Sequence, residues 1–386
     1  MKIACSRGWT CLVSASATAA DPYLESTVPR DGTTQAVSGL GDAVRWNHAK
    51  RLFEVDLPAG LRLYTHGGDP GQDDPGQAGA GTASSNSGSG GSAPLPGAGR
   101  ALPCRTSDSW SYVYVYPTGS PDRFAAVRSS LQDYMERANA KFDSQAYDSS
   151  VNEGEPRRHA DLWSACSGPQ HDANACPASD FGSAAYCAYA NGFNDPSRKY
   201  LVFFDGSNPS GYSGYSSVVG DARRGALNCN NNYYSPPNSM ASCLTSQRES
   251  RYSVVYAGAR TRLTLVHEMS HSMGGVQQTG SGNSNGGPPH PTDGWHCWDG
   301  YDIMCYNDGG PFANGCNTPT DPKGLSCAPL SPISETPFLD RAHDDFFDTY
   351  TEAGEWLASH HDVGQACNGF MRFTDAAGAV LPCSTY

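Results

Sequence analysis

The sequence predicts an α/β (α+β) fold for residues 101–386, and three stretches carry this prediction. Residues 110–116 (Trp-Ser-Tyr-Val-Tyr-Val-Tyr) are β-branched and aromatic, which is typical of a strand. Ser120-Pro121-Asp122 then provides an N-cap and a first-turn proline, and the apolar residues that follow recur at helical spacing. Residues 199–204 (Lys-Tyr-Leu-Val-Phe-Phe) are nearly continuously apolar, as in a strand that is covered on both faces. A strand followed by an amphipathic helix indicates the first half of a βαβ unit.

Three shorter segments precede this domain. Residues 1–20 have a positive start, a short apolar stretch and an A-x-A motif at Ala17-Thr18-Ala19, which together predict a cleavable signal peptide. Residues 21–65 contain short alternating runs that predict a small β-rich element, either a propeptide or an N-terminal addition. Residues 66–100 are dominated by Gly, Ser, Asp, Ala and Pro, and this composition predicts a flexible linker.

Composition and charge narrow the class of protein. The formal net charge of -13 argues against binding to nucleic acid or to an anionic membrane. The chain has 14 cysteines that are scattered rather than grouped as C-x-x-C pairs, which indicates disulfides and a secreted, extracellular protein. No later run approaches the roughly 18 apolar residues of a membrane span. We expect a monomer that acts on a protein or peptide.

The most informative stretch is residues 264–275 (Thr-Leu-Val-His-Glu-Met-Ser-His-Ser-Met-Gly-Gly), which predicts a buried helix that begins near Ala259 and ends at glycines. His267 and His271 are four residues apart, so their imidazoles lie on one helix face at a separation that suits one tetrahedral zinc ion. Glu268 is placed to take a proton from a zinc-bound water. The alternative is a surface helix with two solvated histidines.

A glycine follows the second histidine at a spacing that belongs to a known family. With Gly274 the pattern becomes H-E-x-x-H-x-x-G, which resembles the metzincin zinc peptidases. A glycine at this position lets the chain turn sharply with positive φ. In the family the third ligand, His or Asp, lies three residues further on, but this chain has Gln277, whose neutral amide is a poor zinc ligand.

Two histidines further along are candidates for the third ligand. His290 lies between prolines, and His296 precedes Cys297; Asp293 is a further option. His296 stands eight residues before Met304, a spacing that resembles that of the matrixins and favours His296 over His290. At least one of the two histidines is then a solvated loop residue.

Residues 301–306 (Tyr-Asp-Ile-Met-Cys-Tyr) resemble the methionine turn of the same family. The resemblance implies that Met304 forms an apolar floor beneath the zinc. It also implies that Tyr306 stabilises the oxyanion, as the corresponding tyrosine does in astacins and serralysins. Taken by itself, this run is better interpreted as a strand end with a core methionine.

The resemblance extends over roughly residues 105–362 and is closest to a group of secreted bacterial zinc-metallopeptidase-like proteins. It implies a mixed twisted sheet, an active-site helix, a methionine turn and disulfide-rich loops. The runs that carry it are residues 193–202, 267–277, 289–290, 296–299, 302–306, 343–347 and 356–360.

Two further groups of residues have open assignments. His343, Asp344 and Asp345 either bind a second ion or form a structural histidine with a carboxylate cap. The pairs Cys316 with Cys327 and Cys367 with Cys383 are candidates for local disulfides, although spacing alone does not determine connectivity.

Together these observations predict a secreted zinc-dependent endopeptidase. His267, His271 and either His296 or His290 would hold Zn²⁺, and Glu268 would act as the general base. One alternative is a non-catalytic, zinc-containing binding or adhesion module of the same fold. Another is a zinc hydrolase that cleaves a non-peptide amide.

Overall fold

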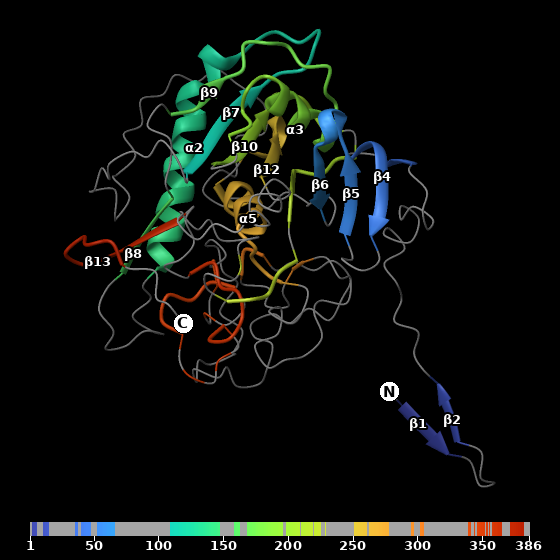
Figure 1. Cartoon of the computed structure of the whole chain (residues 1–386), viewed down its shortest axis with the longest axis vertical. Coiled ribbons are helices and arrows are strands. Elements are labelled where there is room, and N and C mark those ends of the chain that lie inside the picture. Colours follow the sequence, from blue (N-terminus) through green and yellow to red (C-terminus); the bar gives the residue numbers. More distant parts are fainter. Residues whose placement is uncertain are drawn as a thin grey trace.

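A mixed five-stranded sheet with the order β11-β12-β10-β7-β9 is the centre of the structure, a computed structural model (Figure 1). Four strands run parallel, and β11 pairs with β12 in the antiparallel sense at one edge. The strands are β7 (Ser109–Val115), β9 (Gln170–His171), β10 (Arg198–Phe204), β11 (Gly214–Ser216) and β12 (Tyr252–Tyr256).

The structure describes part of the chain. The described residues are 2–5, 11–14, 35–37, 40–47, 52–65, 109–146, 158–162, 168–195, 198–208, 210–218, 220–224, 228, 251–260, 262–277, 295–296, 302–304, 339–340, 343, 346–351, 353, 355, 357–364 and 371–381.

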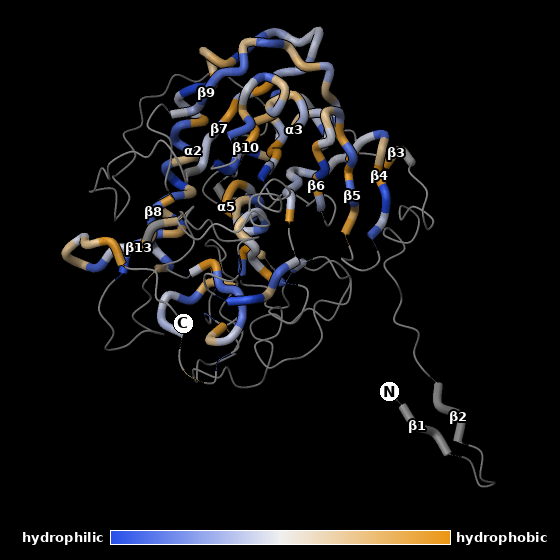
Figure 2. The backbone as a smooth tube through the Cα atoms, viewed as in Figure 1, coloured by the Kyte–Doolittle hydropathy of each residue, from blue (hydrophilic) through white to orange (hydrophobic). Residues whose placement is uncertain are grey.

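Alternating side chains of the central sheet pack into two separate cores. In β7, Trp110, Tyr112 and Tyr114 belong to the core shared with α2 and α5, whereas Val113 and Val115 face the core shared with α3. This division follows from the two-residue period of a strand, and Figure 2 shows hydrophobic colours along β7 and within α5. The helices are α2 (Phe124–Gln145), α3 (Phe181–Ala190) and α5 (Arg262–Ser272).

The predicted strand–helix–strand order is confirmed, because β7 and β10 pair in parallel with α2 between them in sequence. The predicted start of the helix was too early. α2 begins at Phe124, and its backbone N–H donates to Asp122 Oδ1 at 2.9 Å, so Asp122 rather than Ser120 satisfies the first turn.

A four-stranded antiparallel sheet within residues 35–65 packs on the side of α3 away from the central sheet. Gly182 in the first turn of α3 donates to Leu40 O at 3.0 Å, and a Cβ added there would lie 2.8 Å from that oxygen and 2.9 Å from Val55 Cγ1. The glycine therefore lets this sheet lie directly on α3. Its strands are β3 (Gln35–Val37), β4 (Gly41–Asn47), β5 (Leu52–Asp56) and β6 (Arg62–Thr65), with a short 3₁₀ turn, η1 (Pro58–Gly60), before β6.

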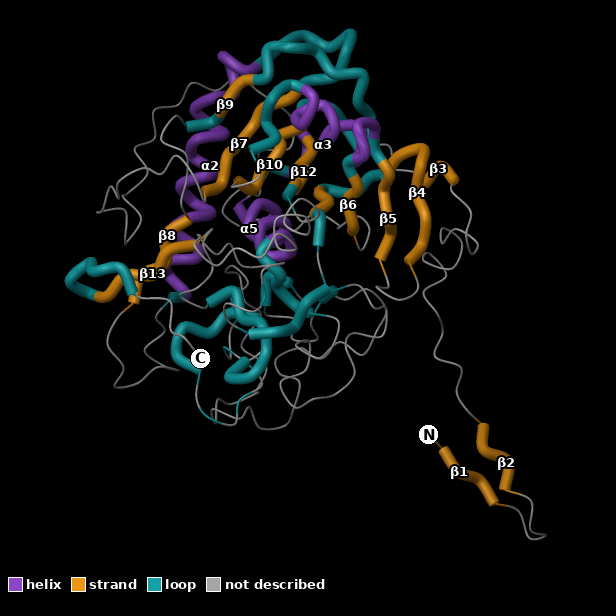
Figure 3. Tube along the Cα trace, viewed as in Figure 1, coloured by secondary structure: helices purple, strands orange, loops and turns teal. Residues whose placement is uncertain are grey.

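The remaining strands form two small antiparallel pairs. β8 (Arg158–Leu162) pairs with β13 (Met371–Asp375), and β1 (Lys2–Cys5) pairs with β2 (Cys11–Ser14). Figure 3 shows that the described segments between α5 and β13 are loops. In the described part of the chain, no helix combines the length and the apolar character needed to cross a membrane.

One disulfide lies within the described residues. Cys176 is bonded to Cys187, with the two Cα atoms 6.0 Å apart. The disulfide links the loop that precedes α3 to the helix itself. The cysteines for which we predicted local pairs (Cys316, Cys327, Cys367 and Cys383) lie outside the described residues, as does the linker of residues 66–100.

Candidate metal centre

Helix α5 presents the H-E-x-x-H motif from the interior of the protein. The predicted start near Ala259 was wrong by three residues, because residues 257–259 form a separate 3₁₀ turn, η4 (Ala257–Ala259), before α5 begins at Arg262. Leu263, Val266 and Met269 are fully buried in the core shared with α2. The helix ends as predicted, with Gly274 at a φ of 85°, a backbone conformation that favours glycine.

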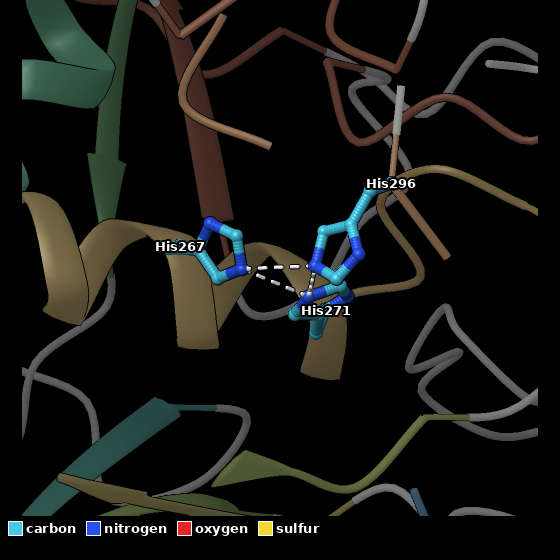
Figure 4. A group of neighbouring side chains, drawn as sticks. All are labelled: His267, His271 and His296. Atoms are coloured by element: carbon cyan, nitrogen blue, oxygen red, sulfur yellow. Dashed lines mark hydrogen bonds between the residues drawn. The ribbon is translucent and has the colours of Figure 1, made fainter. Parts of the chain in front are cut away.

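Three imidazoles converge at this helix (Figure 4). His271 Nε2 lies 3.1 Å from His267 Nε2 and 3.2 Å from His296 Nε2, and the third pair, His267 and His296, is 3.3 Å apart. All three side chains are at most 2 % exposed. Within the described residues, they are the one group of histidine, cysteine or acidic side chains whose geometry suits a metal ion.

The spacing of these nitrogens fits a tetrahedral metal site. Ligands about 2.0–2.1 Å from a zinc ion in tetrahedral geometry lie about 3.3–3.4 Å from one another. The observed separations of 3.1–3.3 Å correspond to that tetrahedral edge. Because the three imidazoles are buried, their converging ring nitrogens have little access to water, and burying such polar atoms costs free energy. A cation bound among the three nitrogens would offset that cost.

The residues that resemble a methionine turn set the tautomer of the first histidine. His267 Nδ1 lies 2.7 Å from the carbonyl oxygen of Ile303, so this nitrogen carries the proton and donates it. Nε2 of His267 is thereby left with the lone pair that a metal needs. The adjacent Met304 is fully buried in the same core as α5. Residue 303 therefore lies directly against the histidine cluster.

Gln277, which stands where the family has its third ligand, has a structural role here. Its amide group donates to Gly274 O and accepts from the Asp221 backbone N–H, both at 2.8 Å. The side chain is 3 % exposed. His296, rather than Gln277, completes the cluster with His267 and His271, and Gln277 holds the turn that follows α5.

Two buried nitrogen donors, one from a lysine and one from a histidine, cap the end of α5, and neither was predicted from the sequence. Lys199 donates through Nζ to Ser272 O, and burial lowers the pKa of Lys199 to about 7. His361 donates through Nε2 to Met273 O at 2.8 Å, and burial lowers the pKa of His361 to about 4, so this imidazole is neutral at pH 7. Both donors satisfy carbonyls that have no partner within the helix. The one sequence signal was a lysine inside an otherwise apolar strand.

The sheet side of α5 is held by hydroxyl groups. Ser216 Oγ on β11 and Ser253 Oγ on β12 donate to the Glu268 carbonyl oxygen at 2.6 and 3.1 Å. The Glu268 side chain is fully buried, and a Cβ added at Gly214 would lie 2.1 Å from its Oε1. The carboxylate therefore lies directly against the backbone of the edge strand.

Several predicted site residues lie outside the described residues: His290, Asp293, Cys297, Tyr306, Asp344 and Asp345. His343 is described and is 1 % exposed, with a φ of 57°. Its Nδ1 lies 3.6 Å from Asp348 Oδ1.

The described fold and site define an α+β protein with a mixed sheet and a buried three-histidine cluster suited to a metal ion. In comparisons with known proteins, no family model matches the chain and no curated protein is significantly similar to it.

Proposed function

We propose that this chain is a secreted zinc-dependent endopeptidase of the metzincin type. The observation that supports this most directly is the set of three Nε2 atoms 3.1–3.3 Å apart, two of them from an H-E-x-x-H helix. The mixed sheet beside that helix and the contact of the Ile303 carbonyl oxygen with His267 further support the proposal.

His267, His271 and His296 would hold the zinc ion and leave a fourth position open. The zinc ion, when bound, supplies the Lewis acid that lowers the pKa of water towards neutrality and polarises the scissile carbonyl. The Glu268 carboxylate accepts the proton of the attacking water and returns it to the leaving amine. The hydroxyl of Tyr306 would donate to the developing oxyanion.

The position of Glu268 depends on a glycine in the edge strand. Gly214→Ala is expected to displace the carboxylate, because the new Cβ would lie 2.6 Å from Glu268 Cδ. A displacement of about 1 Å at a reacting group costs up to about 100-fold in rate. We therefore expect kcat of Gly214→Ala to fall by up to about 100-fold, with the zinc content unchanged.

Gly258→Ala is the matched control for this variant, because nothing lies within 4 Å of a Cβ at Gly258. Peptide cleavage by both variants, followed with a quenched fluorescent substrate, is the measurement. Equal kcat values for Gly214→Ala and wild type would show that Glu268 does not need its observed position.

The proposed activity is tested by cleavage of casein and of a broad peptide library by the purified full chain. We expect cleavage that stops when a chelator removes the metal and returns when one equivalent of zinc is added. Stoichiometric zinc without any cleavage would instead identify a binding module of the same fold.

A further inference from the structure

A small apolar cluster joins the N-terminal sheet to the segment that carries the third histidine. Leu52 on β5 and Tyr64 on β6 pack with Val218 and Trp295, and we call these four residues the Trp295 cluster. None of them is more than 6 % exposed. Trp295 directly precedes His296, so the cluster lies one residue from a proposed metal ligand.

A backbone hydrogen bond strengthens the same connection. The Val218 N–H donates to Tyr64 O at 2.8 Å, and Val218 lies two residues beyond the end of β11. The indole ring of Trp295 lies on Gly220, where an added Cβ would be 2.9 Å from its Cη2 atom. The ring therefore lies in a cluster that includes residues of both the N-terminal sheet and the continuation of β11.

The backbone of Trp295 has an unfavourable conformation. Its φ is 62°, in the left-handed region that bulky side chains rarely adopt. Such a conformation persists only where the surrounding contacts hold it. Within the described residues, this side chain clusters with Leu52, Tyr64 and Val218 and lies close to Gly220. Leu52 and Tyr64 belong to the N-terminal sheet.

We propose that the N-terminal sheet of residues 35–65 positions the third metal ligand, with Tyr64 and Trp295 as the positioning residues. Loss of the Tyr64 ring removes a wall of the pocket that holds the indole. The Trp295 backbone then relaxes from its left-handed conformation, and the His296 ring leaves its place 3.2 Å from His271. This inference rests on the proposed metal centre and gives residues 35–65 a role other than that of an inhibitory propeptide.

The test compares two neighbouring substitutions in the full chain. Tyr64→Ala removes a member of the Trp295 cluster, whereas Leu63→Ala removes a fully buried side chain of the same strand that belongs to the core with α3. Zinc affinity is measured by competition with a chromogenic chelator, and folding is followed by circular dichroism. Tyr64→Leu replaces Tyr64→Ala if the alanine variant does not fold.

We expect Tyr64→Ala to weaken zinc binding at least about tenfold, as the loss of a residue that orients a ligand does. Leu63→Ala should bind zinc as tightly as wild type. The effect of Tyr64→Ala should also disappear in a His296→Ala background, because the substitution acts through that ligand.

Four results would overturn the inference. Equal zinc affinity in Tyr64→Ala and wild type contradicts it and leaves the proposed peptidase activity standing. Equal weakening by Tyr64→Ala and Leu63→Ala, or the same loss with and without His296, assigns the effect to general destabilisation. A wild-type chain that binds no metal overturns both this inference and the proposed function.

Discussion

Glu268→Gln is expected to abolish peptide hydrolysis and to leave zinc bound. Glutamine has nearly the same shape as glutamate, so it fits the buried site against Gly214. Its amide cannot accept the proton of the attacking water, and loss of a general base costs about 10²–10⁴-fold in rate. The measurement is kcat/KM on a peptide substrate, alongside zinc content by atomic absorption.

Glu136→Gln serves as the control for this prediction. Glu136 is exposed on α2, where Gln132 donates to it at 2.8 Å, and the same change of charge there should leave kcat/KM unaltered. A Glu268→Gln variant that cleaves peptides at the wild-type rate would remove Glu268 from the mechanism.

His296→Ala is expected to strip the chain of its stoichiometric zinc. The substitution removes one of three converging imidazoles and leaves two, both on α5. Loss of a ligand should cost more affinity than the roughly 10–100-fold that follows loss of a residue that merely orients one. Equilibrium dialysis against zinc, with metal content measured for each variant, provides the comparison.

Two other histidines are the controls for that variant. His290→Ala changes the alternative candidate for the third ligand, and His171→Ala changes a histidine that stacks on Phe124 with ring centroids 4.5 Å apart. Both variants should keep one zinc per chain. If His290→Ala loses the metal and His296→Ala retains it, the third ligand has been misassigned.

The pair of histidines on α5 could be predicted from sequence because a helix converts a spacing of four residues into a shared face. The third histidine follows no such rule. His296 lies 25 residues after His271, and no regular element in the described part of that interval determines where its ring lies. Spacing to Met304 favoured His296 over His290, but only tertiary structure brings its nitrogen next to His271.

Residues that support α5 were harder to predict. Lys199 was included in a nearly continuous apolar run and given no role, yet it is 2 % exposed because β10 places it at the end of α5. Gln277 was identified as a departure from the family pattern, and one of its two hydrogen bonds comes from the backbone of Asp221, 56 residues earlier in the chain. Buried polar groups need partners, and sequence spacing does not reveal which segments provide them.

The packing of the N-terminal sheet also could not be predicted from the sequence. Alternating residues predicted that β4, β5 and β6 exist, but not where their sheet packs. The position of the sheet depends on the close approach of its residues to Gly182 in α3, and on small buried residues of that helix such as Ala184 and Ala185. A small β-rich element was therefore recognised, and its contact with the Trp295 cluster was not.

The coordination shell of the zinc ion is the most direct measurement of the central claim. X-ray absorption at the zinc edge of the full chain should show three imidazole nitrogens and one oxygen at about 2.0–2.1 Å. A shell with sulfur at about 2.3 Å, or with only two imidazoles, would contradict a site built from His267, His271 and His296.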